Sequence, residues 1–371
     1  MPGHGLEPRH DHGSVLPPEL GDRVENLRDL GASSHDIRQH ADRLSALEFV
    51  HTIWPGERRH TMADVARLVG VSTEEIIAFR VATGFPEPEP TAQVATDDDV
   101  EMYRSIVAAR LLFGDAELMQ LLRVIGASLA KLADAVTSAF LVNVRASDAP
   151  QAPTPPELEI VSELLPRLSL LVDTLLRKHI VAARRPVPTE TTGGWEVQQL
   201  AIGFADLIGS TRLTEERPLA EVGAILSSFE EASSSVVTRH GGRVVKLIGD
   251  EILFAVDDPA KAARIGWAIT QAVAEVGTLP PVRVGLAAGE VLTRDGDVFG
   301  PPVNRAARIV SHAPAGSVLV TPVIRAASML DFSFTAAGSV DLPGFSTTTE
   351  LWRVDAARRD IDAEPDAEDL E

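Results

Sequence analysis

The sequence predicts an all-α domain followed by an α+β domain with a ferredoxin-like core. Residues 18–185 consist almost wholly of helical patterns, whereas residues 196–356 alternate β-prone runs with helical ones. A stretch rich in proline, threonine and glycine lies between them, and we take residues 186–195 as the linker. A chain of 371 residues is long enough for two such domains.

Composition excludes several classes of partner and chemistry. The net charge of −20 argues against nucleic acid and anionic membranes as partners, because both bind cationic surfaces. The chain has no cysteine, so disulfides, thiolate catalysis and zinc–thiolate sites are excluded. It has no apolar run of about 18 residues and no apolar signal core near its N-terminus, so we expect neither a membrane span nor a signal peptide.

Helix caps and hydrophobic periodicity predict the helices of the N-terminal half. Residues 1–17 are rich in glycine, proline and histidine and are expected to form a disordered tail. Ser72 is expected to cap the second helix of the helix-turn-helix, and Thr96 or Asp97 the helix that follows it. We expect helical segments in this order: one or two helices over 18–50, a helix-turn-helix over 61–84, and helices over 95–113 and 115–144.

A long helical stretch, residues 156–185, follows a proline- and alanine-rich linker at 149–156. Pro166 is expected to kink it. Its leucines suit either core packing or a seam between two copies of the chain, and core packing is the favoured interpretation. These leucines are Leu164, Leu165, Leu168, Leu170, Leu171, Leu175 and Leu176.

The helix-turn-helix pattern also occurs in DNA-binding regulators. Its second helix, E-E-I-I-A-F-R-V-A-T-G at residues 74–84, carries one arginine and two glutamates. A helix that faces DNA phosphates should be basic. A DNA-binding regulator is therefore the less favoured interpretation of this segment.

The C-terminal half has the order strand, helix, two strands, helix, strand, which is that of a ferredoxin-like core. The acidic residues 357–371 after it are expected to form a tail. The expected elements are strand 196–206, helix 214–240, hairpin 243–256, helix 259–276, strand 282–293, helix 301–312, strand 317–321, and short strands ending at 352–354.

Polar residues within this core suggest chemistry. Asp206 ends an apolar strand, and Gly209, Ser210 and Thr211 open the next helical segment with backbone N–H groups suited to a phosphate. Mg²⁺ is usually held by one or two carboxylates together with substrate phosphates. The alternative for Asp206 is a helix-capping role.

The hairpin 243–256 turns at Gly249-Asp250, and Lys246 interrupts its first apolar strand. A lone ammonium in such a strand is costly unless something pairs with it. Asp250 stands at the strand end, where a metal ion or phosphate could be reached. The alternative is an ordinary tight turn with a lysine that reaches out to water.

A third stretch, D-G-D-V-F-G-P-P-V-N-R-A-A-R at 295–308, places Asp297 in a loop before a helix that two prolines begin. Asn304 and Arg308 are four residues apart and share one face of that helix. The alternative is a solvated helix with ordinary surface polar groups.

Together these residues resemble the catalytic domain of the class III nucleotidyl cyclases, over about residues 197–356. The resemblance implies an adenylate cyclase that converts ATP to 3′,5′-cyclic AMP and pyrophosphate. It also implies a homodimer with two sites, each with its metal ligands on one chain and its adenine, ribose and transition-state contacts on the other.

The resemblance implies a role for each matched residue. Asp206, the backbone carbonyl of Leu207 and Asp250 match the ligands of two metal ions, Mg²⁺ or Mn²⁺. Lys246 and Asp297 match the pair that selects adenine. Asn304 matches the residue that orients the ribose, and Arg308 the arginine that stabilises the transition state.

The chain departs from the family where cations for the β- and γ-phosphates are common. It has Gly289-Glu290 in the central strand and Leu342-Pro343-Gly344 near the C-terminal hairpin, with no lysine after Lys261. Arg283 or Arg353 could substitute. A catalytically weak, nucleotide-binding signalling module therefore remains an alternative.

Residues 45–185, with A-T-G-F-P-E-P-E-P at 82–90, resemble the N-terminal regulatory domain of actinobacterial adenylate cyclases. The resemblance implies a domain that restrains the catalytic dimer, makes its output pH-dependent and, in some members, is linked to fatty-acid binding. It also implies a cytoplasmic protein. The histidines that could titrate near neutral pH concentrate in the first 60 residues, and the sequence singles out none as a sensor: His4, His10, His12, His35, His40, His51 and His60.

Overall fold

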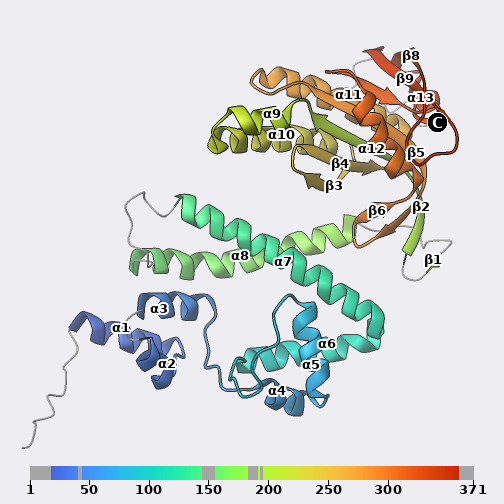
Figure 1. Cartoon of the computed structure of the whole chain (residues 1–371). Helices are drawn as coiled ribbons and strands as arrows, with labels where there is room; N and C mark the ends of the chain where they lie inside the picture. The colour runs from blue at the N-terminus through green and yellow to red at the C-terminus, as the bar shows by residue number, and fades with distance from the viewer. Residues whose placement is uncertain (1–17, 41–43, 144–154, 183–190, 193–194, 359–371) are drawn as a thin grey trace, which may run out of the picture. The chain divides into compact units, whose positions relative to one another are not determined.

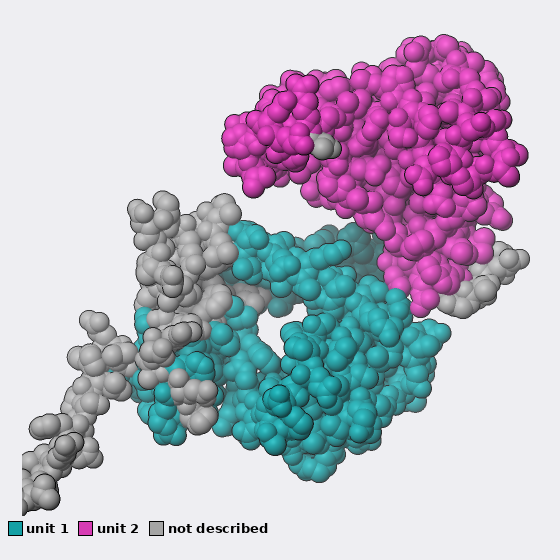
Figure 2. Space-filling model, in the orientation of Figure 1, with its two compact units in different colours: residues 1–184 teal, residues 185–371 magenta. Residues whose placement is uncertain are grey.

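The structure, a computed structural model, describes residues 18–40, 44–143, 155–182, 191–192 and 195–358. The expected tail 1–17, most of the linkers and the acidic tail beyond residue 358 lie outside the described residues. The chain divides into two compact units, residues 1–184 and 185–371 (Figures 1 and 2). Each is described by itself below.

The regular elements of the first unit are helices in its described part, joined by loops. Its helices are α1 (Pro18–Asp29), α2 (Ser34–Gln39), α3 (Leu44–Ile53), α4 (Met62–Val69), α5 (Thr73–Ala82), α6 (Asp97–Phe113), α7 (Asp115–Asn143) and α8 (Pro155–Ala182). The expectation of one or two helices over 18–50 is wrong, because three begin there. Gly31 turns the chain with φ +88°, and the Ser33 side chain then caps α2.

Local caps define the helix-turn-helix and the helix after it. The side chains of Thr61, Ser72 and Thr96 each accept a hydrogen bond from the backbone N–H of the third residue of the helix that follows, and the carboxylate of that third residue accepts one from the backbone N–H of the cap. The caps at Ser72 and Thr96 are thus confirmed. Helices α4 to α7 bury a common core around Val65, Ile76 and Phe79.

The leucines of α8 do not fill a core within the chain. Leu170 is 67% exposed, and Leu164, Leu171, Leu175 and Leu176 are exposed as well. Core packing is therefore the wrong expectation for these five, because no other described helix of the first unit covers this side of α8. Pro166 does lie inside the helix.

The second unit is a mixed sheet with helices on both faces (Figure 1). The strands are β1 (Thr191–Thr192), β2 (Trp195–Leu207), β3 (Arg243–Ile248), β4 (Glu251–Val256), β5 (Val282–Arg294), β6 (Asp297–Phe299), β7 (Val318–Val320), β8 (Phe332–Val340) and β9 (Thr349–Ala357). The helices are α9 (Ser210–Glu216), α10 (Leu219–Arg239), α11 (Pro259–Val276), α12 (Pro301–His312) and α13 (Pro322–Ser328).

The order β3-β4-β2-β5 is that of a ferredoxin-like core, as expected, and β7, β9 and β8 extend the sheet beyond β5. Strand β2 lies in the middle, antiparallel to both β4 and β5. Because side chains alternate along a strand, β2 sends Ala201 and Ala205 into the core shared with α10 and α11. Ile202 and Phe204 enter the opposite core, shared with α12.

Two expectations for this unit are wrong in detail. The single helix expected over 214–240 is two helices, because Pro218 separates α9 from α10 and cannot continue a helix. Asp297 was placed in a loop but begins the short strand β6. Helix α13 was not foreseen.

Helix α12 packs directly on β5. A Cβ built on Gly285 would lie 2.4 Å from the backbone nitrogen of Val310 and 2.7 Å from the carbonyl oxygen of Ala306. Only glycine allows this approach. The helix is thereby fixed on the sheet face to which Phe204 points.

No described helix is both long and apolar enough to span a bilayer.

Candidate active site

Three charged residues lie in one row across the sheet. Asp206 of β2 is paired in register with Glu251 of β4 on one side and with Arg283 of β5 on the other. All three occupy the sheet face that α12 covers, because they alternate with the buried residues of the opposite face. The row crosses the sheet where β2 ends.

Arg283 forms an ion pair with Asp206. Its Nε donates to Oδ2 of Asp206 at 2.7 Å, and a terminal nitrogen lies 2.6 Å from the same oxygen. The other terminal nitrogen donates to the backbone carbonyl of Ser311, near the end of α12, at 3.2 Å. Arg283 therefore connects the acidic row to α12.

Asp250 joins this row from the β3–β4 turn. Gly249 has φ +65°, as the first central residue of a type II′ hairpin turn requires. The backbone N–H of Leu207 donates to the carbonyl of Asp250 at 3.1 Å, which ties the turn to the end of β2. The predicted Gly249-Asp250 turn is confirmed, and it brings Asp250 next to Asp206.

The crowding of carboxyl groups changes their acidity. Burial raises the pKa of Asp206, against the opposing effect of Arg283, and the nearby Asp250 raises it further. Burial, followed by the charges of Asp206 and Asp250, raises the pKa of Glu251 to about 7. Three carboxyl groups thus share one arginine, and the cluster favours a further cation.

This donor set fits a divalent cation bound partly by substrate. No group of three or more His, Asp or Glu among the described residues could by itself hold a metal ion. Two carboxylates, Asp206 and Asp250, with the carbonyl of Leu207 beside them suit Mg²⁺ or Mn²⁺ when phosphate oxygens complete the coordination. The raised pKa of Asp206 is the sign expected where a positive charge is needed.

Lys246 has the partner that an ammonium in an apolar strand requires. Its Nζ lies 2.6 Å from Oδ2 of Asp297. Asp295 and Gly296, both with positive φ, turn β5 into β6 and so carry Asp297 to β3. A second contact, from the Arg243 guanidinium to the Gly296 carbonyl at 2.5 Å, fixes the same turn.

Asn304 and Arg308 both lie on the exposed side of α12. Their side chains make no hydrogen bond or ion pair with any residue that the structure describes. The other side of α12 is buried through Ala306, Ile309 and Val310. The side chains of Asn304 and Arg308 are therefore available to a ligand.

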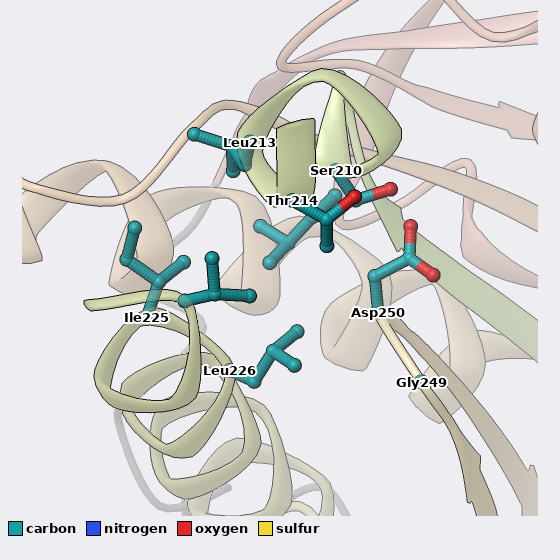
Figure 3. Close-up of a pocket in the computed structure, with 9 residues that line it drawn as sticks. Ser210, Leu213, Thr214, Ile225, Leu226, Gly249 and Asp250 are labelled. Atoms are coloured by element: carbon teal, nitrogen blue, oxygen red, sulfur yellow. The ribbon is translucent and has the colours of Figure 1, made fainter. Parts of the chain in front are cut away.

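A pocket of about 260 Å³ lies between α9, α10 and the β3–β4 turn (Figure 3). Ser210 and Asp250 stand together at one end, whereas Leu213, Ile225 and Leu226 line the other. The pocket places Ser210 beside the acidic cluster. The Gly209 residue before it has φ +82°, and the Thr211 side chain lies outside the described residues.

The predicted residues therefore fall into separate sets. Asp206 and Asp250 lie together, Lys246 is paired with Asp297, and Asn304 shares a helix with Arg308. Among the described residues, no hydrogen bond or ion pair joins one set to another. Sequence reasoning missed Glu251 and did not place Arg283; only the strand register identifies both, because it aligns them with Asp206.

Sequence similarity relates this chain to known proteins. Residues 195–355 match the family model described as the adenylate and guanylate cyclase catalytic domain. The chain is 38% identical over 280 residues to an adenylate cyclase of Streptomyces coelicolor, covering 74% of this chain and 73% of the relative. It is 25% identical over 368 residues to a pH-sensitive adenylate cyclase of Mycobacterium tuberculosis, covering 93% and 90%.

Among solved structures, the crystal structure of the adenylyl cyclase CyaB from P. aeruginosa aligns with 45% of this chain and 98% of its own. The TM-score is 0.42 and the identity 22%.

Proposed function

The chain belongs to the adenylate and guanylate cyclase family as an adenylate cyclase of the actinobacterial type, and on this premise we propose that it forms 3′,5′-cyclic AMP and pyrophosphate from ATP at sites shared by two copies of the chain. The 3′-oxygen of the ribose bonds to the α-phosphorus. The bond from that phosphorus to the bridging oxygen breaks, and pyrophosphate leaves.

The observation that carries the proposal is the pairing of Lys246 with Asp297 at 2.6 Å. The pair presents a donor and an acceptor side by side, which complement the ring nitrogen and the amino group on the adenine edge. A guanine edge has the opposite order of acceptor and donor. Lys246 and Asp297 therefore select adenine.

Asp206, Asp250 and the Leu207 carbonyl would hold two ions, Mg²⁺ or Mn²⁺, in each site. Bound there, such ions activate the attacking oxygen and neutralise charge on the phosphates. Arg283 orients Asp206 through their ion pair. Its second contact, to the Ser311 carbonyl, keeps Asp206 in register with α12.

Asn304 and Arg308 act on the reacting end of the substrate. Asn304 orients the ribose, and Arg308 stabilises the charge that develops on the α-phosphoryl group. Binding of the substrate phosphates by Gly209, Ser210 and Thr211 stays a prediction, because α9 has only seven residues and a weak dipole.

The separation of the residue sets supports a shared site. Within the described part of one chain, no hydrogen bond or ion pair joins the side chains of Asn304 and Arg308 to Asp206 or Asp250, and a second copy of the chain supplies the missing half of each site. The exposed leucines of α8, which precedes the catalytic unit, support a dimer, since a helix face of this kind is rarely left in water. The dimer is isologous and has two sites.

The first unit, residues 1–184, which we call the helical unit, regulates the pair of catalytic units formed by two copies of the chain. Support comes from the similarity over 93% of the chain to a relative named as pH-sensitive. A fatty-acid ligand of this unit stays a prediction from the resemblance. DNA binding loses support, because the Arg80 side chain of α5 donates to the Pro86 carbonyl and lies over the Phe85 ring.

The test is cyclic AMP formation from ATP by the full chain, with Mg²⁺ and with Mn²⁺. Asp250→Asn removes one carboxylate charge without changing shape, and its activity should fall to background while its thermal unfolding stays close to that of wild type. ATP binding without cyclic AMP would instead support a catalytically weak nucleotide-binding module. Near-normal turnover by Asp250→Asn would show that the metal assignment is wrong.

A further inference from the structure

We propose that Arg305, the residue after Asn304 on α12, binds the β- and γ-phosphates of the nucleotide. This inference rests on the proposed function, since it assigns a further substrate contact to the same site.

The Arg305 guanidinium has no anionic partner in the described part of the chain. Its carbon lies 4.5 Å from the centroid of the Phe345 ring, and this stacking uses none of its N–H donors. Many other cations of the catalytic unit have carboxylate partners. The pairs are Arg212–Glu216, Arg217–Glu221, Lys246–Asp297, Lys261–Asp257, Arg264–Asp331, Arg283–Asp206 and Arg353–Asp355.

Arg305 also lies on the correct part of α12. At 3.6 residues per turn, Asn304, Arg308 and Arg305 fall within an arc of about 100°, with Arg308 in the middle. The opposite side of the helix is buried by Ala306 and Val310. One helix edge therefore presents an amide and two guanidinium groups in sequence.

The charge of the triphosphate requires a second cationic side chain beside Arg308. A triphosphate brings several negative charges to a place that already holds Asp206, Asp250 and Glu251. If Arg308 neutralises the α-phosphoryl group, the next phosphates need a second cation beside it. Residues three apart on a helix have Cβ atoms about 5–6 Å apart, so Arg305 and Arg308 can converge on neighbouring phosphates.

Phe345 gives this arginine a fixed orientation. Leu342, in the same turn, is buried, and the Phe345 N–H donates to the Leu342 carbonyl at 3.1 Å. A guanidinium that lies over a ring keeps its N–H groups free to bind a phosphate in bidentate fashion. Stacking thus limits the motion of Arg305 without neutralising it.

The experiment measures binding of inorganic tripolyphosphate and of adenosine to the full chain by calorimetry, in the presence of Mg²⁺. For Arg305→Gln, the Kd of tripolyphosphate should rise about tenfold or more, as expected for a lost charge-assisted hydrogen bond, while the Kd of adenosine stays unchanged. Arg305→Lys should retain most of the tripolyphosphate affinity.

Arg325→Gln is the matched control. Arg325 also stacks on an aromatic ring, that of Trp352 at 3.7 Å, but it belongs to α13 on the opposite sheet face. This variant should bind tripolyphosphate as wild type does. An unchanged tripolyphosphate Kd for Arg305→Gln would overturn the inference, as would an equal weakening of adenosine binding.

The outcome is independent of turnover. A wild-type chain that forms no cyclic AMP would contradict the proposed function, whereas the tripolyphosphate measurement tests Arg305 alone. If Arg305→Gln weakens self-association in sedimentation but leaves tripolyphosphate binding intact, Arg305 is an interface residue and the inference is wrong.

Discussion

Arg283 and Asp206 face each other across β5 and β2, with Nε of the arginine 2.7 Å from a carboxylate oxygen. The same guanidinium reaches the Ser311 carbonyl near the end of α12. One side chain therefore links the expected metal ligand to the helix of Asn304 and Arg308. Because of this link, a displacement of α12 would also displace Asp206.

Replacing Arg283 should affect both stability and activity. Arg283→Gln leaves the half-buried Asp206 without its cation, and the free energy of unfolding should fall by roughly 1–3 kcal/mol. Cyclic AMP formation should fall as well. Chemical denaturation and a cyclase assay measure the two effects. Arg353→Gln, which breaks the exposed pair with Asp355, is the control and should cost about 0–1 kcal/mol.

Nucleotide choice should depend on Lys246 and Asp297. In Lys246→Glu with Asp297→Cys, kcat/KM for ATP should fall about ten- to hundredfold, because each base contact loses its partner. Thermal unfolding should change little, since Lys246 is exposed. Turnover of ATP and GTP measured in parallel gives the preference. An unchanged ATP/GTP ratio would refute the adenine pair.

Mixed dimers should recover activity if sites are shared. Asp206→Ala and Arg308→Ala homodimers each have both sites broken. After chain exchange, about half of the dimers are mixed and have one intact site, so roughly a quarter of wild-type activity should return. Exchange is followed independently by labelled chains. Exchange without recovered activity would show that each site lies within one chain.

Glu251 should make stability depend on pH in the absence of divalent cations. Its ordinary pKa is 4.5, and burial among carboxylates raises it to about 7. Between these values the folded chain keeps a proton that the unfolded chain has released, so the free energy of unfolding falls as pH rises toward 7 and stays low above it.

Glu251→Gln should reduce this slope, leaving the smaller contribution of Asp206, and stabilise the protein above pH 7 by roughly 1–3 kcal/mol. Denaturation in EDTA across pH 5 to 8 measures it. Glu290→Gln, at an exposed position of β5, is the control. Equal slopes for wild type and Glu251→Gln would contradict the assignment of the raised pKa.

Among the histidines of the first unit whose burial the structure describes, His51 is the buried one. Burial lowers the pKa of His51, and the charge of Arg58 adds to this effect against the weaker opposing effects of Leu30 and Asp36. Below about pH 6.5 the unfolded chain takes up a proton that the folded one excludes, so acidification destabilises this unit. Arg58 donates to Nε2 of His51 at 3.3 Å, a bond that requires the neutral ring.

Removing residues 1–189 should therefore change both the rate of cyclic AMP formation and the dependence of this rate on pH. In the full chain, His51→Gln should make the rate depend less on pH on the acidic side of the profile. The assay covers about pH 5 to 8. His40→Gln, at an exposed position, is the control. Identical profiles for the full chain and for residues 190–371 would exclude the helical unit as the pH sensor.

Much of the fold followed from local signals. Caps at Ser72 and Thr96, the turn at Gly249 and the prolines before Asn304 act within a few residues, so the sequence reveals them. Glu251 and Arg283 could not be assigned in this way, because their role comes from strand pairing with Asp206, which lies 45 and 77 residues before them in the chain. The partner of Lys246 was expected only from the resemblance to the family. Local signals do not identify it, because a two-residue turn at Asp295-Gly296 brings Asp297 to Lys246 from a distant part of the chain.

The absence of a side chain at Gly285 has a consequence for natural and laboratory variants. Because the backbone of α12 rests on this position, even a methyl group there would lift the helix from β5 and shift Asn304, Arg305 and Arg308 together. The protein would still be folded and would retain every polar group of its site. A screen that examined only residues in contact with nucleotide would overlook Gly285, although a single added carbon at that position would disable the enzyme.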